Sequence, residues 1–309
     1  STRYTKYKPV IPYYERYKTL MAIQYIDGVY MYQTEEELYD LIKFFRPDIR
    51  ILGEDYIGKP FTGDDLPPEI IYTTRSHEWS TTKMKDTLPI QLAPTISWDR
   101  SFGVLKILDQ TKLPEVEKYI ETTDYKEVIE AIKRLSIRGA PALGVAGAYA
   151  CVLAAYDCNA LVQEAFVEEI LPAWNLIANA RPTAVNLKWA VDIMKRQLED
   201  CLDNTDWDLI ETRRYILSCA KQIHKDDITR CDTLCLFGSS LFPADARVMT
   251  ICNTGGLCSG GIGTALGCIQ YAHAFKKNVE VYVPETRPLL QGARLNTWEL
   301  ERSEIPYKL

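Results

Sequence analysis

The stretch Cys252-Asn-Thr-Gly-Gly-Leu-Cys-Ser-Gly-Gly-Ile-Gly-Thr264 decides the fold. The apolar run Val248–Ile251 precedes it and predicts a buried strand. Apolar residues at helical spacing follow it to about Lys276, and Val279–Val283 predicts the next strand. A strand, a glycine-rich turn, a helix and a second strand make a βαβ unit, so we expect a Rossmann-like parallel sheet in this part of the chain.

The position of this turn also suggests chemistry. Open α/β sheets bind ligands at the carboxyl ends of their strands, and glycines let the backbone approach a ligand closely. The following helix N-terminus favours an anion and makes a nearby thiol reactive, so Cys252 is a candidate catalytic residue. The alternative is that the glycines serve close helix–sheet packing around a small buried Cys252. The turn by itself does not decide between the two interpretations.

Two segments outside this unit carry similar signals. Ser136–Gly147 puts Arg138 beside the exposed amides of a predicted helix start, an arrangement that suits phosphate or, alternatively, close packing of small residues. Glu285–Leu295 places charged groups directly after a buried strand. Its arginines fit a surface position, but Gln291 is harder to explain in that way.

The chain before residue 92 alternates helical and extended patterns. Thr34 with Glu37 forms a capping-box pattern for a helix that ends at Arg46-Pro-Asp48. The remaining elements expected there are a helix over 12–26 and strands at Val29–Tyr32, Ile49–Leu52 and Ile70–Thr73. This alternation predicts a parallel α/β sheet.

The rest of the chain divides by pattern. Residues 88–94 hold two prolines without helical periodicity and predict a linker. Two short segments with an extended pattern follow. The sequence from Asp124 to about Lys225 has a helical pattern with a break at Ala180–Thr183. We therefore expect an α/β protein with four parts: a half domain over 1–87, the linker, a mainly helical domain over 95–225 and a Rossmann-like domain over 226–309. We also expect both ends to interrupt a domain.

Composition limits the function classes. The chain has 309 residues, of which 47% are hydrophobic and 25% charged, as in soluble globular proteins of two or three domains. Neither a long apolar span nor a signal peptide occurs, so we expect a cytoplasmic protein with no membrane partner. The formal net charge of −6 argues against a nucleic-acid partner and favours small molecules. The nine cysteines lack zinc spacing and predict free buried thiols, with no metal site.

The three segments together, in this order, resemble methylthioribose-1-phosphate isomerase and its aldose-1-phosphate isomerase relatives, including ribose-1,5-bisphosphate isomerase. The motifs that carry the resemblance are Ile137-Arg-Gly-Ala-Pro-Ala142, Cys252-Asn-Thr-Gly255, Glu285-Thr-Arg-Pro288 and Gln291-Gly-Ala-Arg-Leu295. Trp98-Asp99 and Leu113-Pro114 extend it, so it covers residues 94–309. It implies an initiation factor 2B-like fold.

The resemblance implies an aldose–ketose isomerase that acts, without a cofactor, on a ribose 1-phosphate substituted at C5. Cys252 matches the catalytic cysteine. The positions matching substrate contacts are Arg138, Gly139, Ala140, Arg181, Asn253, Thr254, Gly255 and Gln291. It also implies a homodimer, or a partner chain that supplies missing pieces. The family's usual histidine before the cysteine is Ile251 here, and its catalytic aspartate belongs to a segment beyond Leu309.

Residues 1–87 have a likeness of their own, to the C-terminal half of a glycerol-3-phosphate-type cytidylyltransferase. It rests mainly on Arg75-Ser-His-Glu-Trp-Ser-Thr-Thr-Lys83. The resemblance implies nucleotide-phosphate contacts at Arg75, Ser80, Thr81 and Thr82, with CTP and magnesium as ligands. A charged surface turn is the alternative. The His-x-Gly-His motif that performs transfer in that family does not occur in residues 1–309.

Three hypotheses follow. The chain is part of an aldose–ketose isomerase fused to a nucleotidyltransferase region; or it is a regulatory or assembly protein of the initiation factor 2B-like fold, in which Cys252 only packs; or its working part is a CTP-dependent nucleotidyltransferase. Retention of Arg138-Gly-Ala140 and of Cys252-Asn-Thr-Gly255 favours the isomerase branch over the regulatory subunits of the exchange factor for translation initiation factor 2.

Overall fold

The computed structural model divides the chain into two compact units, residues 1–86 and 87–309, and each is described by itself. The described residues are 17, 20–21, 26–32, 34–66, 68–73, 94–99, 103–202 and 208–309. Arg75, Ser80, Thr81 and Thr82 lie outside them, as do most of the predicted helix over 12–26 and of the linker over 88–94. The predictions made for those residues stay predictions.

The N-terminal unit contains a parallel strand pair. Helix α2 (Glu35–Phe45) begins where the capping pattern predicts, because the Thr34 side chain accepts a hydrogen bond from the Glu37 amide at 3.1 Å. Strands β1 (Ile49–Gly53) and β2 (Glu69–Thr73) pair in parallel, joined by the turn η1 (Glu54–Tyr56) and a loop. The helix–strand alternation is confirmed for this stretch. The likeness of the sheet to a nucleotidyltransferase stays a prediction.

The strand predicted at Val29–Tyr32 does not form, because residues 26–32 adopt no regular secondary structure. A strand needs a neighbour with which to share backbone hydrogen bonds, and among the described residues β1 and β2 pair only with each other. The Tyr30 ring instead packs on Phe45, with ring centroids 4.3 Å apart. Its aromatic side chain supports local packing and not a sheet.

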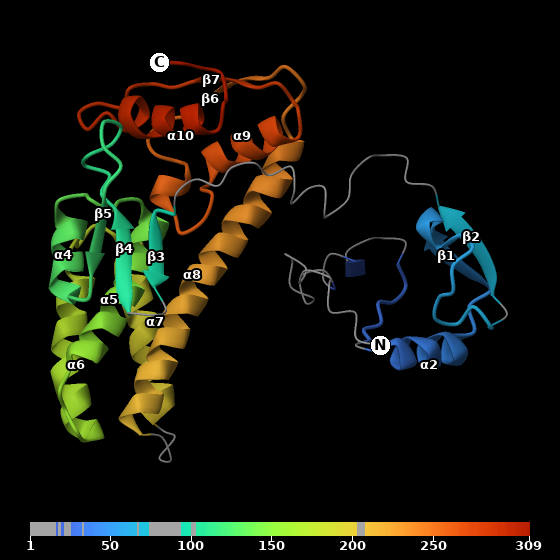
Figure 1. Ribbon diagram of the computed structural model, residues 1–309, viewed down its shortest axis with the longest axis horizontal. Helices are drawn as coiled ribbons and strands as arrows, with labels where there is room; N and C mark the ends of the chain where they lie inside the picture. The colour runs from blue at the N-terminus through green and yellow to red at the C-terminus, as the bar shows by residue number, and fades with distance from the viewer. Residues whose placement is uncertain are drawn as a thin grey trace. The chain divides into compact units, whose positions relative to one another are not determined.

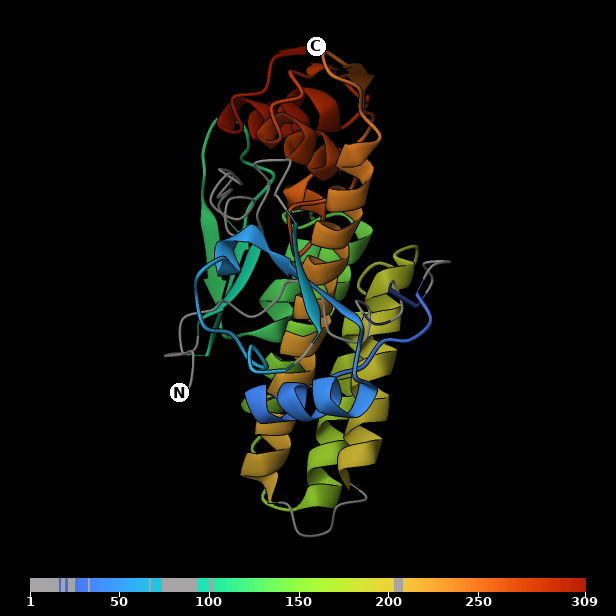
Figure 2. The same cartoon turned by 90° about the vertical axis from the view of Figure 1, so that its right-hand side faces the viewer.

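Residues 94–240 form a helical bundle covered on one side by a small sheet (Figures 1 and 2). The antiparallel sheet contains β3 (Ile96–Asp99), β4 (Val104–Leu108) and β5 (Tyr119–Thr122), in that order. The helices are α4 (Tyr125–Lys133), α5 (Ala140–Asp157), α6 (Gln163–Ala178), α7 (Val185–Leu202) and α8 (Leu209–Ser240). The predicted helical region and its break at Ala180–Thr183 are confirmed.

Helix α5 forms the centre of this bundle. It packs against α4, α6, α7 and α8, and it is buried almost all round. A helix without a polar face is stable only in such a core. By length and composition α5 would also be able to cross a membrane, but 78% of it is buried inside this unit, as expected of a core helix.

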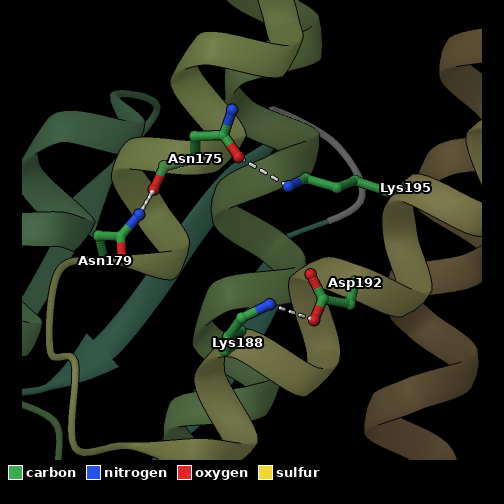
Figure 3. Close-up of polar contacts among 5 residues, drawn as sticks. All are labelled: Asn175, Asn179, Lys188, Asp192 and Lys195. Atoms are coloured by element: carbon green, nitrogen blue, oxygen red, sulfur yellow. Dashed lines mark hydrogen bonds and ion pairs between the residues drawn. The ribbon is translucent and has the colours of Figure 1, made fainter.

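The outer face of the bundle carries exposed polar contacts (Figure 3). The Lys195 ammonium of α7 donates to Asn175 Oδ1 of α6 at 2.7 Å, and Lys188 pairs with Asp192 one turn along α7 at 2.7 Å. Exposed pairs of this kind contribute only about 0.3–0.5 kcal/mol each. The apolar residues between the helices, such as the fully buried Trp174, therefore hold the bundle together.

Helix α8 is longer than the sequence predicts. It begins at a complete capping box between Asp208 and Glu211 and runs to Ser240 without a break at residue 225. In Figures 1 and 2 it reaches from one end of the bundle to the C-terminal sheet, and it packs there on α9 (Ala265–Ala274). One continuous helix thus connects the two parts of this unit.

The C-terminal part is the predicted βαβ unit with one more strand. Strands β6 (Arg247–Met249), β7 (Glu280–Tyr282) and β8 (Tyr307–Lys308) are parallel and lie in the order β6–β7–β8. The glycine turn with η2 (Gly256–Cys258) and then α9 connect β6 to β7. The π-turn η3 (Gly292–Asn296) and α10 (Thr297–Arg302) connect β7 to β8. The mixed α/β fold and the parallel βαβ arrangement are confirmed, whereas the assignment of residues 226–309 as a Rossmann-like domain stays a prediction.

The strand predicted at Val248–Ile251 is not buried as expected. Met249 is 71% and Ile251 65% exposed. Within the part of the chain that the structure describes, β6 pairs on one side only, with β7. This apolar segment therefore forms an edge strand. Hydrophobicity alone does not distinguish an edge strand from a buried central one.

Candidate active site

Cys252 lies three residues beyond Met249, the last paired position of β6, at the carboxyl edge of the parallel sheet. It is exposed, whereas the other eight cysteines are free and buried. Its φ of 67° is in the left-handed region, which residues with a Cβ rarely adopt. Its N–H donates to Thr286 Oγ1 at 3.2 Å and its carbonyl accepts from Asn296 Nδ2 at 2.8 Å. The thiol therefore lies on a backbone that is held at both of its peptide groups.

The glycine turn after Cys252 closes on itself and rests on a buried carboxyl group. Gly255 and Gly263 form an isolated bridge, and Glu299 Oε2 and Oε1 accept from the amides of Gly256 at 2.7 Å and Leu257 at 3.3 Å. Burial raises the pKa of Glu299 to about 8, and the two amide hydrogen bonds offset part of that rise. A Cβ at Gly255 would lie 2.2 Å from Glu299 Oε2, so only glycine leaves room for this contact.

Arg138 reaches the same turn from the start of α5. Gly139, at φ 91°, caps the helix, and a Cβ there would lie 2.4 Å from the Cys258 Cβ and carbonyl oxygen. This close approach brings the N-terminus of α5 against the glycine turn. The predicted contact residue Ala140 is exposed at the first position of the helix.

The charges around Arg138 show what it faces. Burial lowers the pKa of Arg138, a negative charge on Cys252 opposes that shift, and the positive charges of Arg181 and Arg294 add to it. The Cys252 thiol and the guanidinium groups of Arg181 and Arg294 thus each lie within electrostatic range of Arg138. Arg181 comes from the break between α6 and α7, where the sequence predicts it. An anion in this region would relieve the repulsion among the guanidinium groups.

Gln291 joins this cluster through its side-chain amide. Oriented to satisfy both of its groups, its oxygen accepts from Arg138 Nη2 at 2.6 Å and its nitrogen donates to the Thr286 carbonyl at 2.7 Å. The side chain is only 9% exposed. The structure therefore brings together Arg138, Gln291 and Cys252, three residues that the sequence takes from three separate motifs.

Arg294, in contrast, has a structural task. Its guanidinium donates to the carbonyls of Gln110 (2.8 Å) and Leu113 (2.8 Å) in the loop after β4. Gln110 in turn donates to the Leu257 carbonyl at 2.6 Å. These contacts tie the sheet of the bundle to the glycine turn. Arg287, by comparison, is a surface residue whose side chain is 81% exposed and pairs with Glu285.

A half-buried histidine supports the far side of the turn. His224 Nε2 bonds to the Gly260 carbonyl at 3.0 Å, and Nδ1 lies 3.1 Å from the Tyr149 hydroxyl. Because a carbonyl only accepts, the proton is assigned to Nε2. Burial lowers the pKa of His224, with the Gly260 bond and the charge of Asp227 opposing the shift, so this histidine is neutral and positions the turn.

The remaining predicted contacts follow Cys252 directly. Thr254 Oγ1 lies 2.9 Å from Thr250 Oγ1, and the Thr254 carbonyl accepts from the amides of Thr264 and Leu266. Both polar atoms of the Asn253 amide are buried, and neither has a partner among the described residues. A buried amide without partners is costly, which favours a polar ligand beside Cys252. The roles of Asn253 and Thr254 in substrate binding stay predictions.

Thr286, Asn296, Glu299 and His224 were missed by sequence reasoning. Asn296 and Glu299 lie three residues apart and are wholly buried, although polar residues at such spacing usually form a solvated helix face. Asn296 is the last residue of η3, and its side-chain amide donates to the Cys252 carbonyl. Within the described residues, no group of three or more His, Cys, Asp or Glu side chains is arranged to hold a metal ion.

Comparison with known proteins shows which of them this chain is similar to. The chain is 44% identical over 214 residues to the methylthioribose-1-phosphate isomerase of Desulforamulus reducens, covering 69% of this chain and 60% of the relative. It is 45% identical over 215 residues to the protein of the same name from Geobacter metallireducens, covering 70% and 61%. The chain thus spans about three-fifths of the length of the curated relatives it matches.

Two solved structures share the fold. The 5-methylthioribose 1-phosphate isomerase of Pyrococcus horikoshii OT3 has a TM-score of 0.66 at 30% identity, covering 75% of this chain and 62% of that one. Subunit delta of the translation initiation factor eIF-2B from A. fulgidus has a TM-score of 0.63 at 36% identity, covering 70% and 61%. The likeness of residues 1–87 to a cytidylyltransferase stays a prediction. Residues 136–309 match the initiation factor 2 subunit family, so this chain belongs to that family.

Proposed function

We propose that this chain carries much of the substrate site of an aldose–ketose isomerase that acts on a ribose 1-phosphate with a substituent at C5. Substrates of the methylthioribose 1-phosphate or ribose 1,5-bisphosphate type fit this description. The observation that carries the proposal is the meeting of Arg138, Gln291 and Cys252 at the carboxyl edge of the sheet. The relatives named methylthioribose-1-phosphate isomerase support it.

The residues divide the work as follows. Arg138 and Arg181, with amides of the glycine turn, bind the phosphate, which stays on C1 throughout. Gln291 and the unpaired amide of Asn253 bond to sugar hydroxyls. The hydrogen on C2 is replaced by one on C1 as the bond between C1 and the ring oxygen breaks. The proton of the C2 hydroxyl goes to the ring oxygen, so aldose and ketose have the same atoms, and Cys252 takes or returns a proton in this exchange. The family resemblance implies an aspartate as the second group.

Thiol alkylation of the purified chain tests the proposal. Because Cys252 is exposed and the other eight thiols are buried, iodoacetamide should modify Cys252 first. Exposure alone explains that order, so the deciding result is protection: methylthioribose 1-phosphate should slow modification of Cys252, as measured by peptide mass spectrometry. Equal rates with and without the sugar phosphate would contradict the proposal.

Two arginine variants make the test specific. Arg138→Ala removes the guanidinium that contacts Gln291, and the protection should then disappear. Arg287→Ala removes an equal charge from the exposed ion pair with Glu285 and should leave protection unchanged. Loss of protection in both variants would mean that general surface charge, and not this site, attracts the sugar phosphate.

A non-catalytic regulatory protein is the second candidate function. The shared fold with subunit delta of eIF-2B from A. fulgidus favours it. In that case Cys252 would be alkylated at the same rate with or without sugar phosphate, and Cys252→Ser would leave every measured property of the chain unchanged.

For the N-terminal unit we propose the binding of CTP with magnesium, on the resemblance at Arg75 and at Ser80–Thr82 alone. Calorimetry of the whole chain with CTP and magnesium tests it, and an absence of binding heat would overturn it. The homodimer that the isomerase resemblance implies likewise stays a prediction.

A further inference from the structure

The backbone of Cys252 is held in a conformation that it would not adopt alone. Its φ of 67° is unfavourable for a residue with a side chain. The N–H belongs to the peptide group before its Cα and the carbonyl to the one after. Because one hydrogen bond fixes each of these groups, the direction of the Cα–Cβ bond, and with it the reach of the thiol, is fixed too.

Thr286 provides the first of these bonds and links it to the substrate site. Its hydroxyl donates to the Pro284 carbonyl at 3.2 Å, which turns an oxygen lone pair toward the Cys252 N–H, also at 3.2 Å. The Thr286 carbonyl accepts from Gln291, whose oxygen accepts from Arg138. A chain of hydrogen bonds therefore runs from the Cys252 backbone to the guanidinium of Arg138.

Asn296 provides the second bond from a wholly buried position. Its Nδ2 donates to the Cys252 carbonyl at 2.8 Å, while its Oδ1 has no partner within the described part of the chain. An apolar residue of similar size would avoid the cost of that unpaired oxygen. Asn296 also ends a π-turn, a distortion of helices that is frequent at functional sites. These features indicate a role that stability does not explain.

We propose that Asn296 and Thr286 are positioning residues, which lock the Cys252 backbone in its left-handed conformation and so keep the thiol within electrostatic range of Arg138. The inference rests on the proposed function for its catalytic meaning. The lock itself is a property of the backbone that thiol reactivity reports without any turnover. A reacting group displaced by about 1 Å loses about a hundredfold in rate, so a small relaxation at Cys252 would be easy to detect.

The test compares four variants of the whole chain. Asn296→Leu and Thr286→Val each remove one bond to the Cys252 backbone at nearly constant volume. Thr286→Ser keeps the hydroxyl and should restore what Thr286→Val loses. Gln270→Leu is the matched control, because Gln270 is also wholly buried, donates one bond to Ser303 at 3.1 Å and has an unpaired oxygen, but lies on α9.

The readouts are the alkylation rate of Cys252, its protection by methylthioribose 1-phosphate and the unfolding temperature. Asn296→Leu and Thr286→Val should change the alkylation rate by about tenfold or more and weaken protection. Gln270→Leu should lower the unfolding temperature and leave both thiol readouts at the wild-type value. If Asn296→Leu does not fold, the Thr286→Val and Thr286→Ser pair decides the result.

The outcomes separate the two proposals. Wild-type thiol behaviour in Thr286→Val and Asn296→Leu, or a change no larger than that of Gln270→Leu, overturns the positioning role. If the wild-type chain shows no protection by sugar phosphate, the proposed function fails, while the altered alkylation rates of the variants still support or overturn the lock.

Discussion

Glu299 carries a carboxyl group into the interior beneath the glycine turn, and its titration should be measurable. The folded-state pKa is about 8, against an ordinary value of 4.5, because burial disfavours the charged form. Between these values the folded chain keeps a proton that the unfolded chain has released. This contribution to stability is therefore complete below pH 4.5 and is lost as pH rises to about 8, by up to about 1.4 kcal/mol per pH unit.

Replacing the carboxyl group tests this prediction. Glu299→Gln stays neutral and keeps an acceptor for the glycine-turn amides, so its free energy of unfolding should not contain this pH-dependent part. Urea unfolding of both proteins at several pH values from about 5 to 8 should give free energies that lie close together near pH 5 and separate as pH rises, because only the wild type loses stability. Glu301→Gln, on the exposed face of the same helix, should run parallel to the wild type. A parallel course for Glu299→Gln would refute the assignment.

Individual residues also show which parts of the candidate site can be predicted from the sequence. Cys252, Arg138 and Gln291 belong to recognisable motifs, and the structure gathers all three. Asn296 and Glu299 were missed because their importance depends on their burial and on the backbone groups that they contact. Local sequence does not encode burial, so an asparagine that holds a backbone carbonyl looks like any polar residue of a helix.

Helix α8 connects the helical bundle to the C-terminal sheet. It passes from the bundle to the sheet in one piece and carries His224 beneath the glycine turn. Lys225→Pro, at an exposed position in its middle, should remove a backbone hydrogen bond, kink the helix and cost about 3 kcal/mol or more. Lys225→Ala should change stability by only a few tenths of a kcal/mol. Urea unfolding followed by circular dichroism measures both.

A kink at residue 225 should also disturb the thiol site, because Gly260 would lose its contact with His224. Faster or slower alkylation of Cys252 in Lys225→Pro, at a pH where the variant is still folded, would show that coupling. Equal urea midpoints for the proline and alanine variants would mean that the helix does not act as one element.

Helices and strands with clear caps or a clear apolar pattern were predictable from the sequence. The end of α8 and the pairing of single strands were not. α2 and α5 follow from their caps, and β7 follows from its apolar run between two turns. α8 extends beyond the predicted end because Lys225, Asp226 and Asp227 interrupt the apolar stripe without interrupting the helix. Val29–Tyr32 has strand-forming residues but no neighbouring strand within the described residues, so pairing, which is a tertiary property, overrides local preference.

The division into two compact units gives a prediction for the whole molecule. The residues around Cys252 all belong to the unit of residues 87–309. Deleting residues 1–86 should therefore leave Cys252 alkylation and its protection by sugar phosphate at the level of the full chain. The expected result in calorimetry is the opposite: a truncated chain should lose any CTP binding. Loss of sugar-phosphate protection on truncation would mean that the N-terminal unit contributes to the site.

The strand next to Cys252 has a further consequence for the behaviour of the chain in concentrated solution. In the part of the chain that is described, the outer backbone donors and acceptors of β6 face no other strand, and the neighbouring Met249 and Ile251 are largely exposed. An exposed edge strand of this kind is a template for aggregation, since any extended peptide that reaches it can pair with it and extend the sheet. Natural proteins usually place lysine or proline on edge strands to prevent pairing with other chains. The one charged residue of β6 is Arg247, at its first position.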